Sequence, residues 1–220
     1  MDWFPLFNSM RIAALSTLIV LFPGLFAARW VAQMPTSPSR HVWNALFMLP
    51  LVLPPPAAGW LVLQTFGPDH MIGYWMRQIF DVNLLISWQL AAFTSALMSF
   101  PLMYRMSLHA LRSVDPAPCE IARTLGCTDA WIFWRVQVPL CEEGILAGTA
   151  LSFARALGEY GAVYMLSRGE DTISGTIFSL WTRDDPTGAF LWTLLGFALS
   201  AAFLLTVSVL EGTRKGAESR

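Results

Sequence analysis

Four long stretches of this chain contain no Asp, Glu, Lys or Arg, and most of their positions are apolar. They cover residues 12–28, 43–66, 82–104 and 188–210. A helix needs about 20 mostly apolar residues to cross the hydrocarbon core of a membrane, which is about 30 Å thick. A buried core helix explains one such stretch, whereas four of them in 220 residues predict an integral membrane protein.

A fifth span is predicted between residues 141 and 167, although Arg155 and Glu159 interrupt its apolar run. The chain therefore reads as one all-α domain over residues 1–220, a polytopic transmembrane helical bundle of about five spans. The spans are placed at about 11–29, 43–66, 82–104, 141–167 and 188–210, with a long loop at 105–139.

The distribution of basic residues predicts the orientation of the bundle, because loops rich in Lys and Arg face the cytoplasm. An odd number of spans puts the termini on opposite sides. With a cytoplasmic C-terminus, the inside segments hold Arg29, Arg40, Arg105, Arg112, Arg123, Arg135, Arg214, Lys215 and Arg220. The outside segments hold Arg11, Arg77, Arg168 and Arg183. This asymmetry predicts the N-terminus outside and the C-terminus in the cytoplasm.

The composition supports a membrane protein and excludes some functions. The chain is 55% hydrophobic and 13% charged, whereas about a quarter of the residues of a soluble domain are charged. A net charge of -1 without a basic tract gives no sign of nucleic-acid binding. Lys215 is the only lysine and precedes Gly216, so the chain lacks the glycine-rich loop ending in Lys-Ser/Thr that binds nucleotide phosphates. Any ATP must be used by a partner.

No catalytic, metal-binding or cofactor-binding residue is predicted. The spacing of Cys119, Cys127 and Cys141 matches no paired-cysteine zinc pattern. We expect these cysteines to be reduced and to have no functional role. The three histidines, at 41, 70 and 109, form no metal-binding pair at helical spacing. The chain also lacks a Gly-x-Ser-x-Gly nucleophile turn. An intramembrane enzyme is therefore the weaker alternative.

The loop at 105–139 is too long for a turn and contains two predicted short helices. Asp115-Pro116 suits a helix start and Gly126 a helix stop. Thr128 can cap the second helix, which Pro139 is expected to end. Periodicity alone leaves two interpretations open, a docking surface for a partner or an amphipathic hairpin lying on lipid.

The spacing inside this loop resembles a family signature. Glu120-Ile121-Ala122, then Gly126, then Val136-x-Val138-Pro139 is similar to the cytoplasmic signature loop of binding-protein-dependent ABC importer permeases. The departures are Ile121 in place of the family's first alanine and valines in place of Ile and Leu. A membrane scaffold or channel would have no reason to keep this spacing.

The resemblance implies the type I ABC importer permease fold in a bacterial inner membrane. It implies that Glu120, Ala122, Gly126 and Pro139 belong to a coupling-helix loop that docks on a separate ATPase subunit. The implied partners are a second copy of this chain, two cytoplasmic ATP-binding subunits, a periplasmic oxyanion-binding protein and membrane lipid. The implied complex hydrolyses ATP, while this chain binds no cofactor.

Four segments resemble the molybdate branch of this family. They cover residues 49–55, 98–103, 122–126 and 153–161. Sulfate and thiosulfate permeases share a similar segment at residues 154–159. The resemblance therefore implies import of a tetrahedral oxyanion, with molybdate first, tungstate close behind, and sulfate or thiosulfate as the alternative.

Arg155 and Glu159 lie four residues apart, so one helix face can bring them together as an ion pair. Ionisable residues at membrane depth face protein or a water-filled cavity. They form either a structural ion pair or a counter-charge on the path of a dianion. We favour the structural pair, because a strong fixed cation would trap a dianion and conduction requires weak binding.

Small residues and prolines mark two further features of the predicted spans. A stripe at four-residue spacing either packs helices closely or lines the pathway, and it consists of Gly144, Gly148, Ser152 and Ala156. Proline at membrane depth frees backbone carbonyls that protein or water must satisfy. The second span is therefore predicted to bend beside the pathway, at Pro54 and Pro55 and their neighbours Pro50 and Pro56.

Overall fold

A computed structural model of the chain describes residues 3–66, 70, 78, 88–167 and 172–218, and this part is helical without a β-strand. Residues 82–87 of the predicted third span lie outside the described residues, as do Arg77, Arg168 and Arg220.

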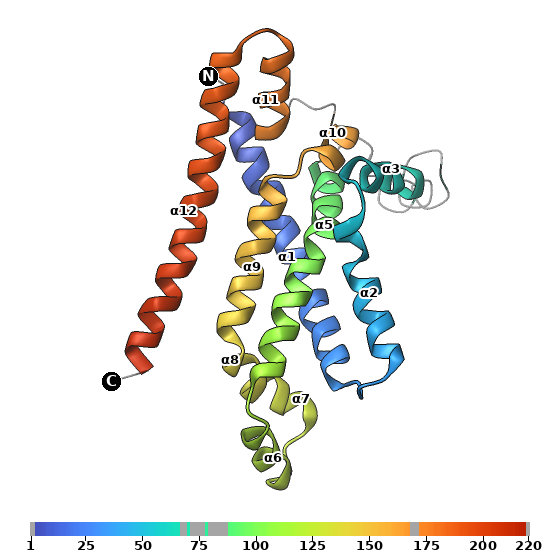
Figure 1. Cartoon of the computed structure of the whole chain (residues 1–220), viewed down its shortest axis with the longest axis vertical. Coiled ribbons are helices and arrows are strands. Elements are labelled where there is room, and N and C mark those ends of the chain that lie inside the picture. The colour runs from blue at the N-terminus through green and yellow to red at the C-terminus, as the bar shows by residue number, and fades with distance from the viewer. Residues whose placement is uncertain (1–2, 67–69, 71–77, 79–87, 168–171, 219–220) are drawn as a thin grey trace.

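Three helices form the centre of the bundle (Figure 1). They are α1 (Phe4–Gln33), α5 (Trp88–Ser113) and α9 (Glu142–Leu157). Small side chains let their backbones approach: a β-carbon added to Gly24 of α1 would lie 2.7 Å from Cγ of Met103 on α5. The Ser16 hydroxyl donates to the carbonyl of Ala92 at 2.8 Å. Close packing and hydrogen bonds of this kind hold membrane helices together.

The second predicted span is broken into α2 (Pro38–Val52) and α3 (Pro55–Phe66), which meet at an angle of 101°. Proline lacks an amide hydrogen and disfavours helical geometry in the residue before it. Accordingly Leu53, just before Pro54, has an extended backbone with φ -65° and ψ 133°. The bend predicted from the prolines is present.

The predicted span at 141–167 is not one helix in the structure. Helix α9 ends at Leu157, and α10 (Gly161–Ser167) follows after three residues that belong to no helix. Gly158 and Gly161 flank this break, and glycine weakens a helix. The 16 residues of α9 extend about 24 Å, less than the thickness of the hydrocarbon core.

The third predicted span continues further than the sequence suggested. It was expected to end at Tyr104, but α5 runs to Ser113, so the first part of the predicted loop is helical. No glycine or proline lies between these two residues to stop the helix. Arg112 stands in the last turn, where a cation interacts favourably with the helix dipole.

A hairpin of short helices projects from one end of the bundle (Figure 1). It consists of α6 (Ala117–Thr124), α7 (Asp129–Ile132), a π-helical turn (Phe133–Gln137) and α8 (Val138–Leu140). The C-terminus lies towards this end and the N-terminus at the other (Figure 1). The termini are therefore at opposite ends of the bundle.

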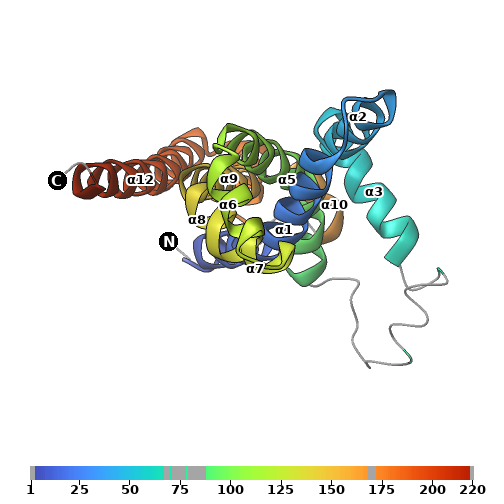
Figure 2. The same cartoon turned by 90° about the horizontal axis from the view of Figure 1, so that it is seen from below.

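Two helices follow α10. The predicted outer loop contains α11 (Ile173–Thr182), whose start is capped by Thr172, because Oγ1 of Thr172 accepts from the Gly175 amide at 3.2 Å. Helix α12 (Pro186–Glu218) then runs back along the bundle and contacts α9, where the ring centres of Phe153 and Phe203 lie 4.1 Å apart. Figure 2 shows α12 and α3 projecting on opposite sides.

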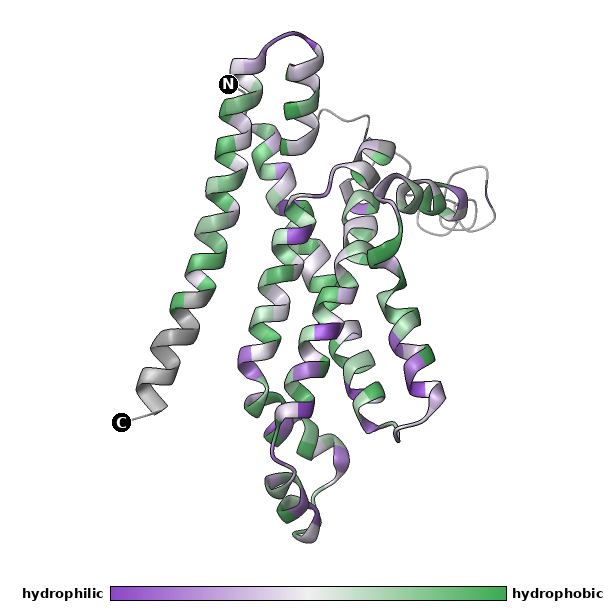
Figure 3. Ribbon diagram, viewed as in Figure 1, coloured by the Kyte–Doolittle hydropathy of each residue, from purple (hydrophilic) through white to green (hydrophobic). Residues whose placement is uncertain are grey.

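By length and composition, α1 and the Pro186–Val207 part of α12 are able to cross a membrane, and the bent pair α2–α3 is a third candidate. Figure 3 shows that hydrophobic residues predominate along the coloured part of α12. Helices α5 and α9 were expected as further spans but do not meet this criterion among the described residues. Helix α9 is too short, and α5 carries buried polar residues, namely Thr94, Ser95, Ser99 and Ser107.

Candidate functional site

The first arm of the hairpin has a defined beginning and end. The carboxylate of Asp115 accepts from the Ala117 amide at 3.0 Å, which opens α6. At the other end, the Cys127 amide donates to the carbonyl of Ala122 at 3.1 Å, and the Gly126 amide to that of Arg123 at 3.0 Å. This pair of bonds is the Schellman motif, and Gly126 adopts its left-handed conformation with φ 85°. Gly126 therefore forms the tight turn.

The second arm packs against the first. Oγ1 of Thr128 accepts from the Trp131 amide at 3.3 Å and caps α7, as the sequence predicted. Cys119 and Ala122 of α6 are buried against Ile132 of α7. This buried contact holds the two arms together as one unit.

Pro139 does not end the second arm as expected. The chain passes through a π-helical turn, in which the Val138 amide donates to the carbonyl of Phe133, and continues as α8 to Leu140. The π-helical turn is wider than an α-helical turn, so it accommodates Pro139, which has no amide hydrogen to donate, without breaking the helix. The break comes at Cys141, just before α9 begins.

The hairpin is joined to α1 through a contact that the sequence did not indicate. The guanidinium of Arg29 lies 4.0 Å from the ring centre of Phe133 and donates to the carbonyl of Asp129 at 3.1 Å. Phe133 is fully buried. Cation–π contacts of this kind are stabilising, so α1 and the hairpin are tied together.

The outer face of α6 is exposed and partly apolar. Ile121 is 60% exposed and Leu125 is 77% exposed. The carboxylate of Glu120 lies on the same short helix, is exposed, and forms no ion pair or hydrogen bond within the described part of the chain. Exposed apolar side chains beside an unpaired charge suit a protein-binding surface.

The break between α2 and α3 lies against the break between α9 and α10. A β-carbon added to Gly161, at the start of α10, would lie 2.9 Å from Cβ of Pro55 and 3.0 Å from Cδ of Pro56. Non-helical backbone at membrane depth must be covered by protein or water. Here the two breaks cover part of each other.

Arg155 and Glu159 form an ion pair beside this contact, although the two residues do not share a helix. Arg155 stands in the last turn of α9, and Glu159 follows the helix cap at Gly158. The side chain of Glu159 is 1% exposed and that of Arg155 is 29% exposed. The carboxylate is therefore buried, while the guanidinium group that pairs with it stays partly exposed.

The small-residue stripe packs against α5 within the chain. Gly144 faces Ala110 so closely that a β-carbon would overlap it, and one on Gly148 would lie 3.0 Å from Cβ of Met106. The buried Ser152 hydroxyl lies 3.5 Å from the carbonyl of Ser99. Three of the four stripe residues thus serve helix packing.

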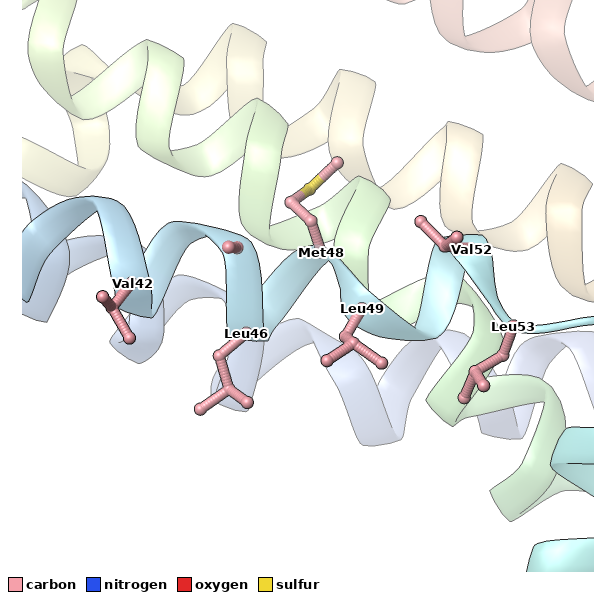
Figure 4. A pocket seen from close by; sticks show the side chains of 7 residues that line it. Val42, Leu46, Met48, Leu49, Val52 and Leu53 are labelled. Carbon is pink, nitrogen blue, oxygen red and sulfur yellow. The ribbon is translucent and has the colours of Figure 1, made fainter.

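A groove of about 630 Å³ runs along the outer side of α2 (Figure 4). Val42, Leu46 and Leu49 project on the same side of the helix, and Val52 is 82% exposed. Every lining side chain is apolar: Val42, Ala45, Leu46, Met48, Leu49, Val52 and Leu53. This surface suits lipid or protein rather than an anion.

The described residues contain no group of three or more His, Cys, Asp or Glu that is placed to hold a metal ion. All three cysteines are free: Cys119 and Cys141 are buried and Cys127 is partly exposed.

Comparison with known proteins identifies relatives over most of the chain. Residues 12–212 match the family described as binding-protein-dependent transport system inner membrane component. The chain is 35% identical over 209 residues to the molybdenum transport system permease protein ModB of Escherichia coli (strain K12), covering 93% of this chain and 91% of the relative. It is 32% identical over 207 residues to the sulfate transport system permease protein CysT of the same organism, covering 90% and 73%.

Solved structures share the fold. A chain of the MetNI methionine ABC transporter in an inward-facing conformation matches with a TM-score of 0.68 at 14% identity, over 95% of this chain and 99% of that chain. A chain of the bacterial alginate ABC transporter, in complex with an alginate pentasaccharide-bound periplasmic protein, matches with a TM-score of 0.66 at 18% identity, over 91% and 74%. This chain therefore belongs to the binding-protein-dependent transport system inner membrane components, the permeases of ABC importers, and has their type I fold.

Proposed function

We propose that this permease passes a tetrahedral oxyanion across the bacterial inner membrane, with molybdate as its main substrate and tungstate as a close second. The similarity to the molybdenum permease over nearly the whole chain carries this choice. Molybdate and tungstate have similar size and charge, so few features of a helical pathway distinguish them. Selection then rests mainly on the periplasmic protein that delivers the anion.

In the proposed complex two copies of the chain span the membrane together, and each binds one cytoplasmic ATP-binding subunit. The hairpin α6–α8 supports this assignment, because its arms are packed together, tied to α1 and exposed along α6. A rigid hairpin transmits the closure of an ATPase to the bundle better than a flexible loop. ATP is hydrolysed by the partner, and lipid covers the outer helices.

The proposed orientation places the hairpin and the C-terminus in the cytoplasm and the N-terminus outside. The opposite positions of the two termini support it (Figure 1), as does the excess of basic residues in the segments on the hairpin side. The N-terminal end, with α11, would then face the periplasmic binding protein.

Sulfate or thiosulfate import is the second candidate, because a sulfate permease matches the chain at a comparable identity. The test is uptake of labelled molybdate at limiting concentration by cells with and without this chain and without a second molybdate system. Sulfate and tungstate are added as competitors. Import of molybdate requires uptake that depends on the chain and is inhibited by tungstate more than by sulfate. Equal molybdate uptake with and without the chain would exclude the proposal.

A further inference from the structure

A second cavity, of about 570 Å³, lies between the first turns of α2 and the last turns of α5. It is at the end of the bundle that carries the hairpin, where Figure 3 shows polar segments on both helices. We call it the α2–α5 cavity, and it is lined by His41, Asn44, Arg105, Met106, Leu108, His109 and Arg112. Two lining residues are arginines and two are histidines, and none is acidic.

The positive charges around this cavity have no counter-charge among the residues that the structure describes. The guanidinium groups of Arg105, Arg112 and the neighbouring Arg40 form no ion pair or hydrogen bond with any residue that the structure describes. The nearest carboxylate along the chain, that of Asp115, instead accepts from the Ala117 amide. Partial loss of hydration and, after it, the charge of Arg40 lower the pKa of Arg112 below its ordinary value. These cations therefore repel one another, which an anion would relieve.

The donors converge from two helices. Arg105, His109 and Arg112 follow one another at spacings of four and three residues, which places them on one face of α5. On α2, Oδ1 of Asn44 accepts a hydrogen bond from the hydroxyl of the buried Tyr104. With its oxygen engaged in this way, Asn44 has its amide hydrogens left as donors. Guanidinium groups match the paired oxygens of an oxyanion.

We propose that the α2–α5 cavity binds a tetrahedral oxyanion group, supplied by a free anion such as molybdate or phosphate or by the phosphate of an anionic lipid. Only the assignment of the cavity to the cytoplasmic side rests on the proposed function. Arg105, His109 and Arg112 are exposed, and exposed charge pairs contribute little binding free energy. The site therefore binds weakly and reversibly, so it can hold an anion without trapping it.

The test for a free anion uses the full chain in nanodiscs of phosphatidylcholine alone. Its thermal unfolding is followed with sodium molybdate or sodium phosphate, against sodium chloride at equal ionic strength. Both oxyanions should raise the Tm of the natural chain in a concentration-dependent way. The double variant Arg105→Gln/Arg112→Gln should lose most of the rise, with affinity falling about two- to fivefold for each arginine removed. The control Arg183→Gln removes the same charge after α11, at the other end of the bundle, and should keep the response.

The test for a lipid source repeats these measurements in nanodiscs that also contain phosphatidylglycerol. A lipid in the site raises the Tm of the natural chain and of Arg183→Gln, but not that of the double variant, and it abolishes the further rise with free oxyanion. Arg112→Lys, which keeps the charge but loses the paired donors, provides a milder second variant. Equal responses of the natural chain and both cavity variants in both membranes would overturn the proposal, as would no response in either. Neither result depends on which solute the permease imports.

Discussion

Gly161 and Pro55 lie so close that a β-carbon on the glycine would stand 2.9 Å from Cβ of the proline. These residues begin α10 and α3, so the contact joins the two broken segments of the bundle. The proline ring is stiff and its neighbour Pro56 is equally close. Neither the glycine nor the two prolines can make room for a β-carbon unless the backbone moves.

Gly161→Ala should therefore destabilise the chain by about 1–3 kcal/mol, the usual range for overpacking. The control is Gly158→Ala, since a β-carbon there would lie 3.7 Å from the nearest atom, the Ala154 carbonyl oxygen. Thermal unfolding of both variants in the same detergent measures the difference. Equal loss of stability in the two variants would show that the contact with Pro55 is unimportant.

A substitution at Gly126 is expected to act in a different way. No atom lies within 4 Å of a β-carbon placed at this position, but the backbone has a φ of 85°. Only backbone strain acts at this position, and left-handed backbone costs a residue with a β-carbon about 1–2 kcal/mol. Gly126→Val should thus distort the hairpin and weaken both the retention of the ATPase subunit and transport-linked ATP hydrolysis.

Gly126→Asn is the matched control for this strain, because asparagine tolerates the left-handed region. It should retain most of the complex in a pull-down with the ATPase subunit. If the valine and asparagine variants behave alike, the turn conformation is not what the coupling requires.

The Arg155–Glu159 pair is expected to depend on both partners. Either single change, Arg155→Met or Glu159→Gln, leaves one group without its counter-charge in a poorly solvated place, which typically costs about 3–5 kcal/mol for a buried pair. The double change Arg155→Met/Glu159→Leu should cost less than the single changes. Thermal unfolding of the three variants tests this order.

A transport role for the same pair would give a different pattern. Stable single variants that import a changed set of anions would favour the counter-charge interpretation over the structural one. Measuring molybdate and sulfate uptake beside the unfolding temperature separates the two.

The orientation is testable with a membrane-impermeant thiol reagent. Cys119 and Cys141 are buried and would resist the reagent on either side of the membrane. Better probes are Leu125→Cys and Trp181→Cys, placed singly in a chain whose natural cysteines are replaced, since Leu125 is 77% and Trp181 66% exposed. In intact spheroplasts the probe at 181 should react, and the probe at 125 only after lysis. The reverse pattern would invert the topology.

Local patterns in the sequence predicted the features that depend on neighbouring residues. The bend at Pro54, the turn at Gly126 and the cap at Thr128 each follow from the backbone preferences of one or two residue types. The apolar runs likewise indicated the helices, since their length is set by the membrane.

The remaining features depend on contacts between distant segments. Nothing near Arg29 in the sequence indicates that it meets Phe133. The division of the predicted span at 141–167 into α9 and α10 depends partly on the packing of Gly161 against Pro55. The sequence predicts that the basic residues of α2 and α5 lie on the cytoplasmic side, but only the arrangement of the two helices brings them to one cavity. Helix α5 also continues past Tyr104 to Ser113, so the first part of the predicted loop is helical.

Helix α12 has a consequence for how the polypeptide can be divided. Only 6% of its most apolar window is buried in the chain, against 39% for α1. A helix of this length satisfies its own backbone hydrogen bonds and inserts without a neighbour. The turn before it, at Asp184 and Asp185, is exposed. If the chain were cut at this turn, the fragment that carries α12 is therefore expected to enter the membrane without help from the rest of the bundle.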